Sequence, residues 1–218
     1  MNMENGRDGS YRVLLSGGEG EYVEKKSRFI ATLRKCESEE EAVRFIEEMK
    51  KKYWDARHNC SAFVIGIRAE LTRCSDDGEP SGTAGRPMLE VLTGEGIRNA
   101  AVVVTRYFGG VLLGTGGLVR AYTQAVKEGL RNCLVGRMRP GYEAVAEADY
   151  GDIGKVQYLL KERGIEPLST EYGQNVALRL HIPAEALGIL KKELADATSG
   201  RVGLAGLKEI YYIDKETF

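Results

Sequence analysis

The stretch that decides the fold is Ala100–Gly117, AAVVVTRYFGGVLLGTGG. Its first six residues form a continuous apolar, valine-rich run, which is typical of a strand buried on both faces. The residues that follow are rich in glycine and lead into an amphipathic pattern over 118–132. We therefore predict a central strand over 100–105, then a glycine-rich loop, then a helix over 118–132.

Shorter periodic segments precede this unit. Alternating apolar residues predict strands over 11–15, 22–25 and 27–33, with a hairpin turn at Ser16-Gly17-Gly18. Ser38 is followed by three glutamates, which predicts a helix start, because a serine hydroxyl caps free amides and acids complement the helix dipole. The remaining expectations are a strand over 61–67, a loop over 68–85 and a short helix over 87–92.

A break in the pattern at residues 135–141 divides the chain. This segment holds two glycines, a proline and two arginines, so we expect a linker between an N-terminal domain, 1–134, and a C-terminal domain, 142–218. Residues 1–10 are expected to be a loose leader. The C-terminal segments follow the order β-α-β-β-α-β, which is the ferredoxin-like arrangement, and the predicted class of the whole chain is α+β.

Composition restricts the function. The 218 residues include 31 Lys and Arg against 32 Asp and Glu, a net charge of -1, so any basic site must be local. The four cysteines have no paired spacing and there are two histidines, which argues against zinc. With no apolar run long enough for a bilayer and no signal-like leader, we expect a cytoplasmic protein with no cofactor, no metal and no membrane partner.

The glycine-rich loop before the predicted helix has two interpretations. Free amides at a helix start, next to glycines without Cβ atoms, suit an anion such as phosphate. The known nucleotide fingerprints are missing, because no Gly-Lys-Ser/Thr occurs and Val119 stands where the dinucleotide motif needs its third glycine. A tight structural turn with close helix packing is the alternative.

Basic residues gather around this loop. Residues 98–139 contain seven Lys and Arg and one acid, and helical spacing puts Arg120, Lys127 and Arg131 on one side of the helix. Beside Tyr107 and Phe108, such a stripe resembles a footprint for a nucleic-acid backbone with stacking residues; a solvated helix face with core aromatics is the alternative. The predicted ligand-binding residues are Arg106, Tyr107, Phe108, Gly109, Gly110, Gly114, Thr115, Gly116, Gly117, Arg120, Lys127 and Arg131.

A second candidate site lies in the predicted loop over 68–85. Acidic oxygens there could hold Mg²⁺ beside a hydroxyl nucleophile, although the spacing of a calcium loop is absent and a solvated loop is the alternative. His58 and Cys60 share a strand face and could form a catalytic pair, or simply pack. No catalytic residue is predicted, and the residues of this possible functional loop are His58, Asp76, Asp77, Glu79, Ser81 and Thr83.

Four ordered motifs within residues 22–132 resemble the Impact family, in particular its bacterial YigZ-like branch. They are DARHNC (55–60), SDDGEPSGTAGRPML (75–89), VVTRYFGG (103–110) and LGTGGLVRAY (113–122). The resemblance implies an N-terminal domain of the ribosomal protein S5 domain 2-like type followed by a ferredoxin-like domain. It also implies a role in translation, since the eukaryotic relatives are translational regulators. Those relatives usually carry a different N-terminal domain, and we expect this chain to have no such extension.

We therefore expect a cytoplasmic, non-catalytic protein that acts on translation by contacting RNA, the ribosome or a protein partner through the glycine-rich basic face. The alternative is a small hydrolase or peptidase-like enzyme that uses the Asp76–Thr83 loop near His58. The positions of Glu79, Arg106 and His58 discriminate between the two. Convergence in one pocket favours an enzyme, and dispersal over a convex basic face favours binding.

Overall fold

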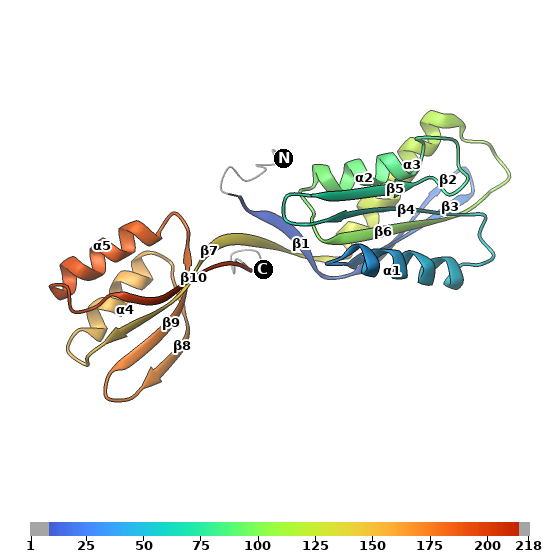
Figure 1. Cartoon of the computed structure of the whole chain (residues 1–218). Coiled ribbons are helices and arrows are strands. Elements are labelled where there is room, and N and C mark those ends of the chain that lie inside the picture. Colours follow the sequence, from blue (N-terminus) through green and yellow to red (C-terminus); the bar gives the residue numbers. More distant parts are fainter. Residues whose placement is uncertain (1–8, 214–218) are drawn as a thin grey trace. The chain divides into compact units, whose positions relative to one another are not determined.

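The computed structural model describes residues 9–213, which form two compact units: Tyr11–Arg137, and 138–213 together with residues 9–10 (Figure 1). Residues 1–8 of the expected leader lie outside the described part. The class is α+β: antiparallel sheets carry five helices in the described residues. That each unit folds independently stays a prediction.

The first unit is built on a five-stranded sheet with the order β2-β3-β6-β4-β5. Its central strand, β6 (Ala100–Tyr107), pairs antiparallel with β3 (Ser27–Lys35) and with β4 (His58–Ile65). The edges are β2 (Gly18–Glu24) and β5 (Leu71–Ser75). The prediction of a central strand over 100–105 is confirmed.

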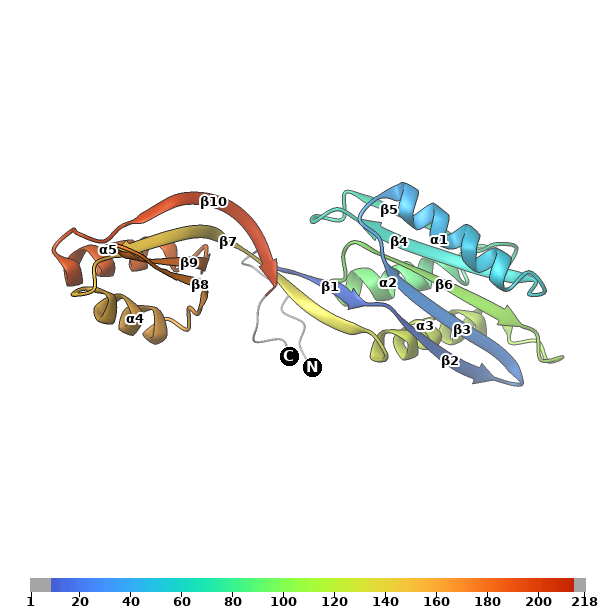
Figure 2. The same ribbon diagram turned by 90° about the horizontal axis from the view of Figure 1, so that it is seen from below.

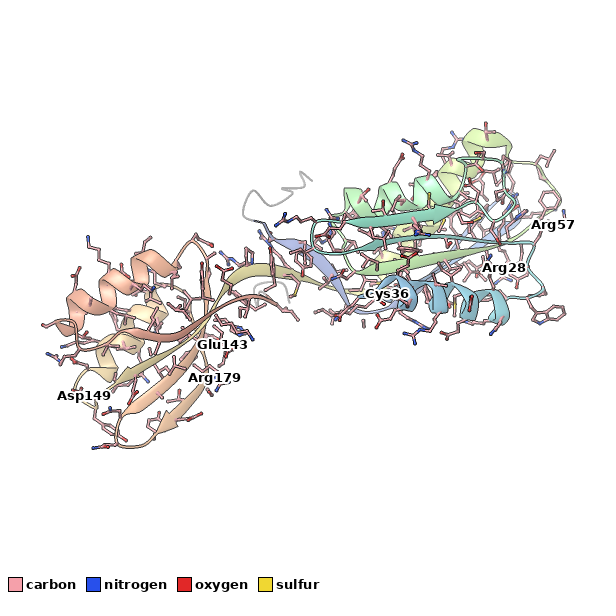
Figure 3. All side chains as sticks on the ribbon, in the orientation of Figure 1. Arg28, Cys36, Arg57, Glu143, Asp149 and Arg179 are labelled. Atoms are coloured by element: carbon pink, nitrogen blue, oxygen red, sulfur yellow. The ribbon has the colours of Figure 1, made fainter. Side chains whose placement is uncertain are left out.

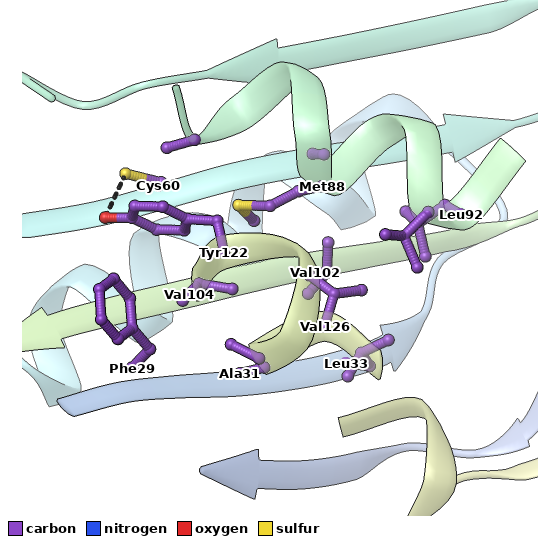
Figure 4. Close-up of a cluster of buried hydrophobic side chains, with 14 of the residues drawn as sticks. Phe29, Ala31, Leu33, Cys60, Met88, Leu92, Val102, Val104, Tyr122 and Val126 are labelled. Carbon is purple, nitrogen blue, oxygen red and sulfur yellow. Dashed lines mark hydrogen bonds between the residues drawn. The ribbon is translucent and has the colours of Figure 1, made fainter. Parts of the chain in front are cut away.

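Both faces of β6 are buried, because successive side chains point to opposite faces of a strand. Ala100, Val102 and Val104 belong to one core, which α2 (Gly85–Gly94) and α3 (Gly114–Arg131) cover, as Figures 1 and 4 show. Ala101 and Val103 belong to a second core under α1 (Glu39–Lys52), on the opposite side of the sheet in Figure 2. The valine-rich run thus separates two hydrophobic layers.

The predicted hairpin at Ser16-Gly17-Gly18 is wrong. β1 (Tyr11–Ser16) pairs with β7 (Leu134–Ala148) instead of with β2. The true hairpin joins β2 to β3 and turns at Lys25 and Lys26, which both adopt positive φ angles (47° and 68°). Sequence inspection missed it because non-glycine residues rarely take this conformation and nothing in Lys-Lys signals a turn.

Two further boundaries differ from expectation. Residues 71–75, expected as part of a loop, form the edge strand β5, whose residues pair with Ser61–Ile65 of β4. Its side chains are mostly exposed, so the segment shows no apolar alternation. The helix expected over 118–132 begins at Gly114, so Gly114, Gly116 and Gly117 of the predicted loop lie in the first turn of α3, whereas Gly109 and Gly110 precede the helix.

The second unit holds a four-stranded antiparallel sheet with the order β10-β7-β9-β8, formed by β7, β8 (Pro167–Tyr172), β9 (Val176–Pro183) and β10 (Leu204–Ile213). The helices α4 (Ile153–Glu162) and α5 (Leu187–Thr198) pack against a core that includes Leu178, Leu180 and Leu190. The predicted order of elements is confirmed.

The expectation of an irregular linker at 135–141 is wrong, because these residues lie inside the 15-residue strand β7. Gly141 pairs with both Pro183 and Ile210, and a Cβ there would collide with the Ile182 carbonyl, so this glycine serves close strand packing rather than a turn. Pro140, in register with Tyr211, uses its carbonyl to accept a hydrogen bond from the Ala184 amide. Glycine and proline alone therefore did not distinguish a linker from a strand.

Candidate functional site

A pocket of about 640 Å³ opens at one end of the first unit. It lies where β6 ends, β4 begins and α3 starts. Arg57, on the segment before β4, is at its rim, and Figure 3 shows the labelled Arg57 at this end of the unit. The lining residues are Asp55, Arg57, His58, Gly78, Glu79, Pro80, Arg106, Tyr107, Phe108, Leu112, Leu113, Gly114, Thr115 and Leu118.

A buried ion pair lies at this pocket. The Arg106 Nη1 donates to the Glu79 Oε1 at 2.6 Å, and the two side chains are only 8% and 3% exposed. The Tyr122 hydroxyl donates to the same carboxylate oxygen at 2.8 Å. A buried carboxylate needs such partners, and Arg106 and Tyr122 supply them to the same oxygen of Glu79.

Tyr122 and Cys60 form the inner side of this network. The Cys60 Sγ lies 3.3 Å from the Tyr122 hydroxyl and 2.9 Å from the Asp76 carbonyl oxygen, and Figure 4 shows the first of these contacts. Burial raises the pKa of Cys60 to about 12, and burial likewise raises the pKa of Tyr122 above its usual value. The thiolate is therefore not populated near neutral pH, and the suggested His58–Cys60 nucleophile is not supported.

His58 lines the pocket next to Arg106, its register partner across β4 and β6. Its Nδ1 lies 2.9 Å from the Asp77 carbonyl oxygen. Because a carbonyl oxygen can only accept, Nδ1 carries the proton in this hydrogen bond. The bond fixes the orientation of the ring. Glu79, Arg106 and His58 therefore converge in one pocket.

The other acidic residues of the predicted functional loop have structural partners. The Asp76 carboxylate accepts hydrogen bonds from the amides of Gly82, Ala84 and Gly85, so it caps the start of α2. Burial alone would raise the pKa of Asp76, but these three bonds outweigh it and the pKa lies below its usual value. Asp77 pairs with Lys50 through one oxygen, at 2.6 Å, and accepts from the Asn59 amide through the other.

The predicted hydroxyl nucleophiles are outside the pocket lining. Thr83 is buried, and its hydroxyl donates to the Pro80 carbonyl oxygen at 2.7 Å. Ser81 is exposed and does not line the pocket. Across residues 9–213, no group of three or more His, Cys, Asp or Glu side chains is placed to hold a metal ion.

The predicted basic face is divided by the structure. Arg120, Lys127 and Arg131 are exposed on α3, as expected from the helical spacing. Arg131 pairs with Glu128, and it lines a shallow hollow with Lys127, whereas Arg120 lines a different one. Arg106 does not belong to this surface, because it is buried and paired with Glu79. Spacing along one helix could not reveal the environment of a residue on a neighbouring strand.

The predicted glycines serve different purposes. A Cβ on Gly109 would collide with the backbone of Lys26, so this glycine is required by close packing. Gly110 and Gly114 have positive φ angles of 84° and 69°, which explains the glycine at each. An added Cβ at Gly116 would meet no atom within 4 Å, and its φ is not positive. Neither packing nor backbone conformation requires glycine at this last position.

Several pocket residues were not anticipated. Leu112, Leu113 and Leu118 form an apolar part of the lining, and Tyr122 binds Glu79 from the buried face of α3. A tyrosine within an otherwise apolar helix face is a signal in itself, since its buried hydroxyl needs a partner. The identity of that partner depends on which loop folds over the helix.

Comparison with known proteins identifies the family. A protein-family model described as the Impact N-terminal domain matches residues 25–130. A second family model, described as a domain of unknown function (DUF1949), matches residues 147–201. The IMPACT family member YvyE of Bacillus subtilis (strain 168) is 39% identical over 206 residues, covering 94% of each chain. The chain belongs to the IMPACT family. The resemblance inferred from its motifs is thereby confirmed.

Other members of the IMPACT family extend this result. The IMPACT family member YigZ of Escherichia coli (strain K12) is 38% identical over 187 residues, 85% of this chain and 92% of that protein. The protein IMPACT of Danio rerio is 34% identical over 106 residues, 46% of this chain and 32% of that protein. A crystal structure described as that of a hypothetical protein has a TM-score of 0.57 and 36% identity, and the match covers 91% of this chain and 98% of the other.

Proposed function

We propose that this IMPACT family member is a cytoplasmic, non-catalytic binding protein that acts on translation by contacting single-stranded RNA. The contact surface consists of the pocket mouth and the exposed side of α3. Family membership supports a role shared with the IMPACT proteins. None of the helices within residues 9–213 has the length and apolar character needed to cross a bilayer.

The observation that carries this proposal is the combination of exposed apolar side chains with a buried cation. Phe108, Val111 and Leu112 are 58%, 45% and 83% exposed on the loop after β6. Directly beneath, the Arg106 guanidinium carbon lies 5.7 Å from the Phe108 ring centroid. Bases stack on exposed aromatic rings, and phosphates bind guanidinium groups, so a single strand of RNA matches both features.

The exposed cations of α3 extend this surface. Arg120, Lys127 and Arg131 follow the helix from its pocket end toward its C-terminus at Arg131. Exposed cations attract a phosphate backbone through release of its counterions, which gives a binding free energy independent of base sequence. The cations of α3 therefore contribute affinity for RNA of any sequence, and the pocket contributes discrimination between ligands.

We also propose that the two units have the finer folds implied by the motifs. In the first unit, helices cover both faces of a five-stranded sheet, which supports an S5 domain 2-like assignment. In the second, the strand order β10-β7-β9-β8 with two helices supports a ferredoxin-like assignment. Both assignments accord with a protein of the translation apparatus, on fold analogy alone.

Salt dependence of RNA binding tests the proposed function. Binding of a labelled single-stranded oligoribonucleotide should weaken with salt, with a log–log slope of about -0.7 per neutralised phosphate. Replacing Arg120, Lys127 and Arg131 with Gln should flatten this slope by up to about two. Replacing Lys161, Lys191 and Lys192 of the second unit with Gln removes the same charge and should leave the slope unchanged.

A second pair of variants tests stacking. Phe108→Ala should cost about 1–3 kcal/mol of binding free energy with little change in slope. Tyr158→Ala, at an exposed tyrosine of α4, is the control that should bind as the parent does. RNA affinity that is absent, or unaffected by all the α3 and Phe108 variants, would overturn the RNA proposal in favour of a protein partner on the same surface.

Convergence of Glu79, Arg106 and His58 favours a second candidate, a small hydrolase. Against it stand the engaged Glu79 carboxylate, the high pKa of Cys60 and the positions of Ser81 and Thr83 outside the lining. Turnover of peptide or phosphate-ester substrates that is lost in His58→Ala, with folding intact, would establish the hydrolase. We expect no such turnover.

A further inference from the structure

The Arg106 side chain has hydrogen-bonding capacity that the protein does not use. A guanidinium carries five N–H donors, and the Glu79 carboxylate receives one of them, from Nη1. Nε is buried and has no hydrogen-bond partner among the described residues. Nε is closed off by the protein itself, so a ligand does not reach it directly. The Nη2 group also makes no hydrogen bond with the described residues, and unlike Nε it is not closed off, so it is the donor that an acceptor from outside the protein can engage.

The start of α3 contributes to the same pocket. Gly114 and Thr115, the first two residues of the helix, both line it. The side chain of Leu113, the residue before the helix, does not cap it, no other side chain within residues 9–213 accepts from its first amides, and the first turn contains no acidic residue. The helix is 18 residues long, and free amides with the positive end of its dipole favour an anion there. Two independent features, a buried guanidinium and an open helix start, thus face one cavity.

We propose that this pocket binds a phosphate monoester, as the terminal phosphate of an RNA strand or of a free nucleotide. A three-oxygen phosphate group provides acceptors for Arg106 and for the α3 amides together. The apolar lining, which includes Phe108, Leu112 and Leu113, accommodates the attached nucleoside. The terminal-RNA form of this inference rests on the proposed RNA-binding function and deepens it.

The position of Arg106 distinguishes a strand end from a strand interior. The guanidinium is buried between two rings, with its carbon 5.4 Å from the Phe29 centroid and 5.7 Å from the Phe108 centroid. An internal phosphodiester would have to bring two flanking nucleotides to this depth, one entering and one leaving. A terminal phosphate requires one strand to enter, and it carries additional negative charge. The buried guanidinium of Arg106 therefore favours a phosphate at the end of an RNA strand over one in its interior.

Glu79 is a positioning residue in this arrangement. It binds Nη1 at 2.6 Å and is itself fixed by the Tyr122 hydroxyl, so the guanidinium plane is held before a ligand arrives. Pre-organisation of this kind lowers the conformational cost of binding. Asp55, the other acid in the lining, accepts a hydrogen bond from the Tyr107 hydroxyl. Each acid in the lining therefore already has a hydrogen-bond partner within the protein.

Oligoribonucleotides that differ only at their ends test the inference. Fluorescence anisotropy should show at least about tenfold tighter binding of a 5′- or 3′-phosphorylated strand than of the matched hydroxyl-ended strand. AMP and inorganic phosphate, added as competitors, should release the phosphorylated strand, and adenosine should not. Equal affinity for phosphorylated and hydroxyl ends would overturn the inference while leaving RNA binding intact. Binding of AMP without RNA would support it and overturn the proposed function.

A charge variant tests the site itself. Thr115→Asp places a carboxylate at the start of α3, which suits the helix but repels a phosphate, so AMP affinity should fall at least about tenfold with folding preserved. Thr72→Asp adds the same charge on the exposed strand β5, away from the pocket, and should bind AMP as the parent does. If both variants retain the parent affinity, α3 does not form the site.

The Arg106 Nε–H proton provides a direct readout that does not require a pocket variant to fold. In a ¹⁵N-resolved NMR spectrum of the parent protein, AMP should shift this resonance, which is assigned by its loss in Arg106→Lys. Should that variant unfold, through-bond assignment in the parent serves instead. A saturating AMP titration that leaves the Nε–H and Nη–H resonances of Arg106 unmoved would exclude Arg106 as the phosphate ligand and overturn the proposal.

Discussion

The helices α2 and α3 of the first unit both begin with backbone amides that have no acceptor within their own helix. The two helix starts differ in whether a side chain accepts hydrogen bonds from these amides. Both first turns begin with glycine and lack an acidic residue. At α2, the Asp76 carboxylate accepts from three amides around the helix start. At α3, none of the described side chains accepts from the first amides, and Gly114 and Thr115 line the pocket. The protein thus supplies its own anion at one helix start and leaves the other accessible.

The difference indicates which glycine-rich segment is structural and which is available for binding. The loop before α2 is closed because the Asp76 carboxylate accepts hydrogen bonds from the amides of Gly82 and Gly85, and the Asp77 carboxylate accepts one from the Asn59 amide of β4. The loop before α3 exposes Phe108 and Leu112, with the buried Arg106 beneath them. Helix starts with similar sequences can therefore have different roles, and stability measurements can separate them.

The largest expected effect concerns the ion pair beside α3. Arg106→Met should lower the free energy of unfolding by about 3–5 kcal/mol, because it leaves the Glu79 carboxylate buried without its cation. The double variant Glu79→Gln, Arg106→Met should recover much of this loss, since no unpaired charge remains. Urea denaturation measures both. A single variant that loses less than about 1 kcal/mol would show that Glu79 does not depend on Arg106.

The cap of α2 should come next in size. Asp76→Ala should lower the free energy of unfolding by about 2 kcal/mol, because the amides of Ala84 and Gly85 lose their acceptor. Thr115→Ala, at the uncapped start of α3, should change it by less than about 0.5 kcal/mol. If urea denaturation gave the same change in the free energy of unfolding for both substitutions, the starts of α2 and α3 would not differ in capping.

The dependence of folding stability on acidic pH should also depend on the Asp76 cap of α2. The pKa of Asp76 is lowered in the folded state, so its ionised form stabilises the fold at pH above the usual carboxyl range of about 4. This contribution should be lost as the pH falls through the lowered pKa. Asp76→Asn should therefore lose less stability than the parent between neutral and acidic pH. Parallel pH profiles of the melting temperature would contradict this.

The smallest expected effect is an increase in folding stability. Thr115→Asp should raise the free energy of unfolding by about 0.3–1 kcal/mol, because a carboxylate in the first turn complements the positive end of α3. The gain should diminish with added salt, which screens exposed charges. A loss of stability in thermal or urea unfolding would indicate that the acceptors this helix start requires are already present in the protein.

Much of the fold followed from local patterns. The run Ala100–Thr105 predicted a central strand because valines on both faces need two apolar layers, and Ser38 predicted the start of α1 because its hydroxyl binds the Glu41 amide. The pairing of β1 with β7 and the turn at Lys25-Lys26 did not follow. Pairing joins residues more than a hundred positions apart, and no local periodicity encodes such a partner.

The sequence by itself determined the family, the order of elements in the second unit and the presence of an anion-suited helix start after a glycine-rich segment. Only the tertiary structure decided that Glu79, Arg106 and Tyr122 meet, since they come from a loop, a strand and a helix. It also assigned Asp76 to a cap and showed that Arg106 is buried, although the local excess of basic residues in the sequence groups it with the exposed cations of α3. Burial sets whether a charge is solvated or must find a partner, and burial is a property of the assembled chain.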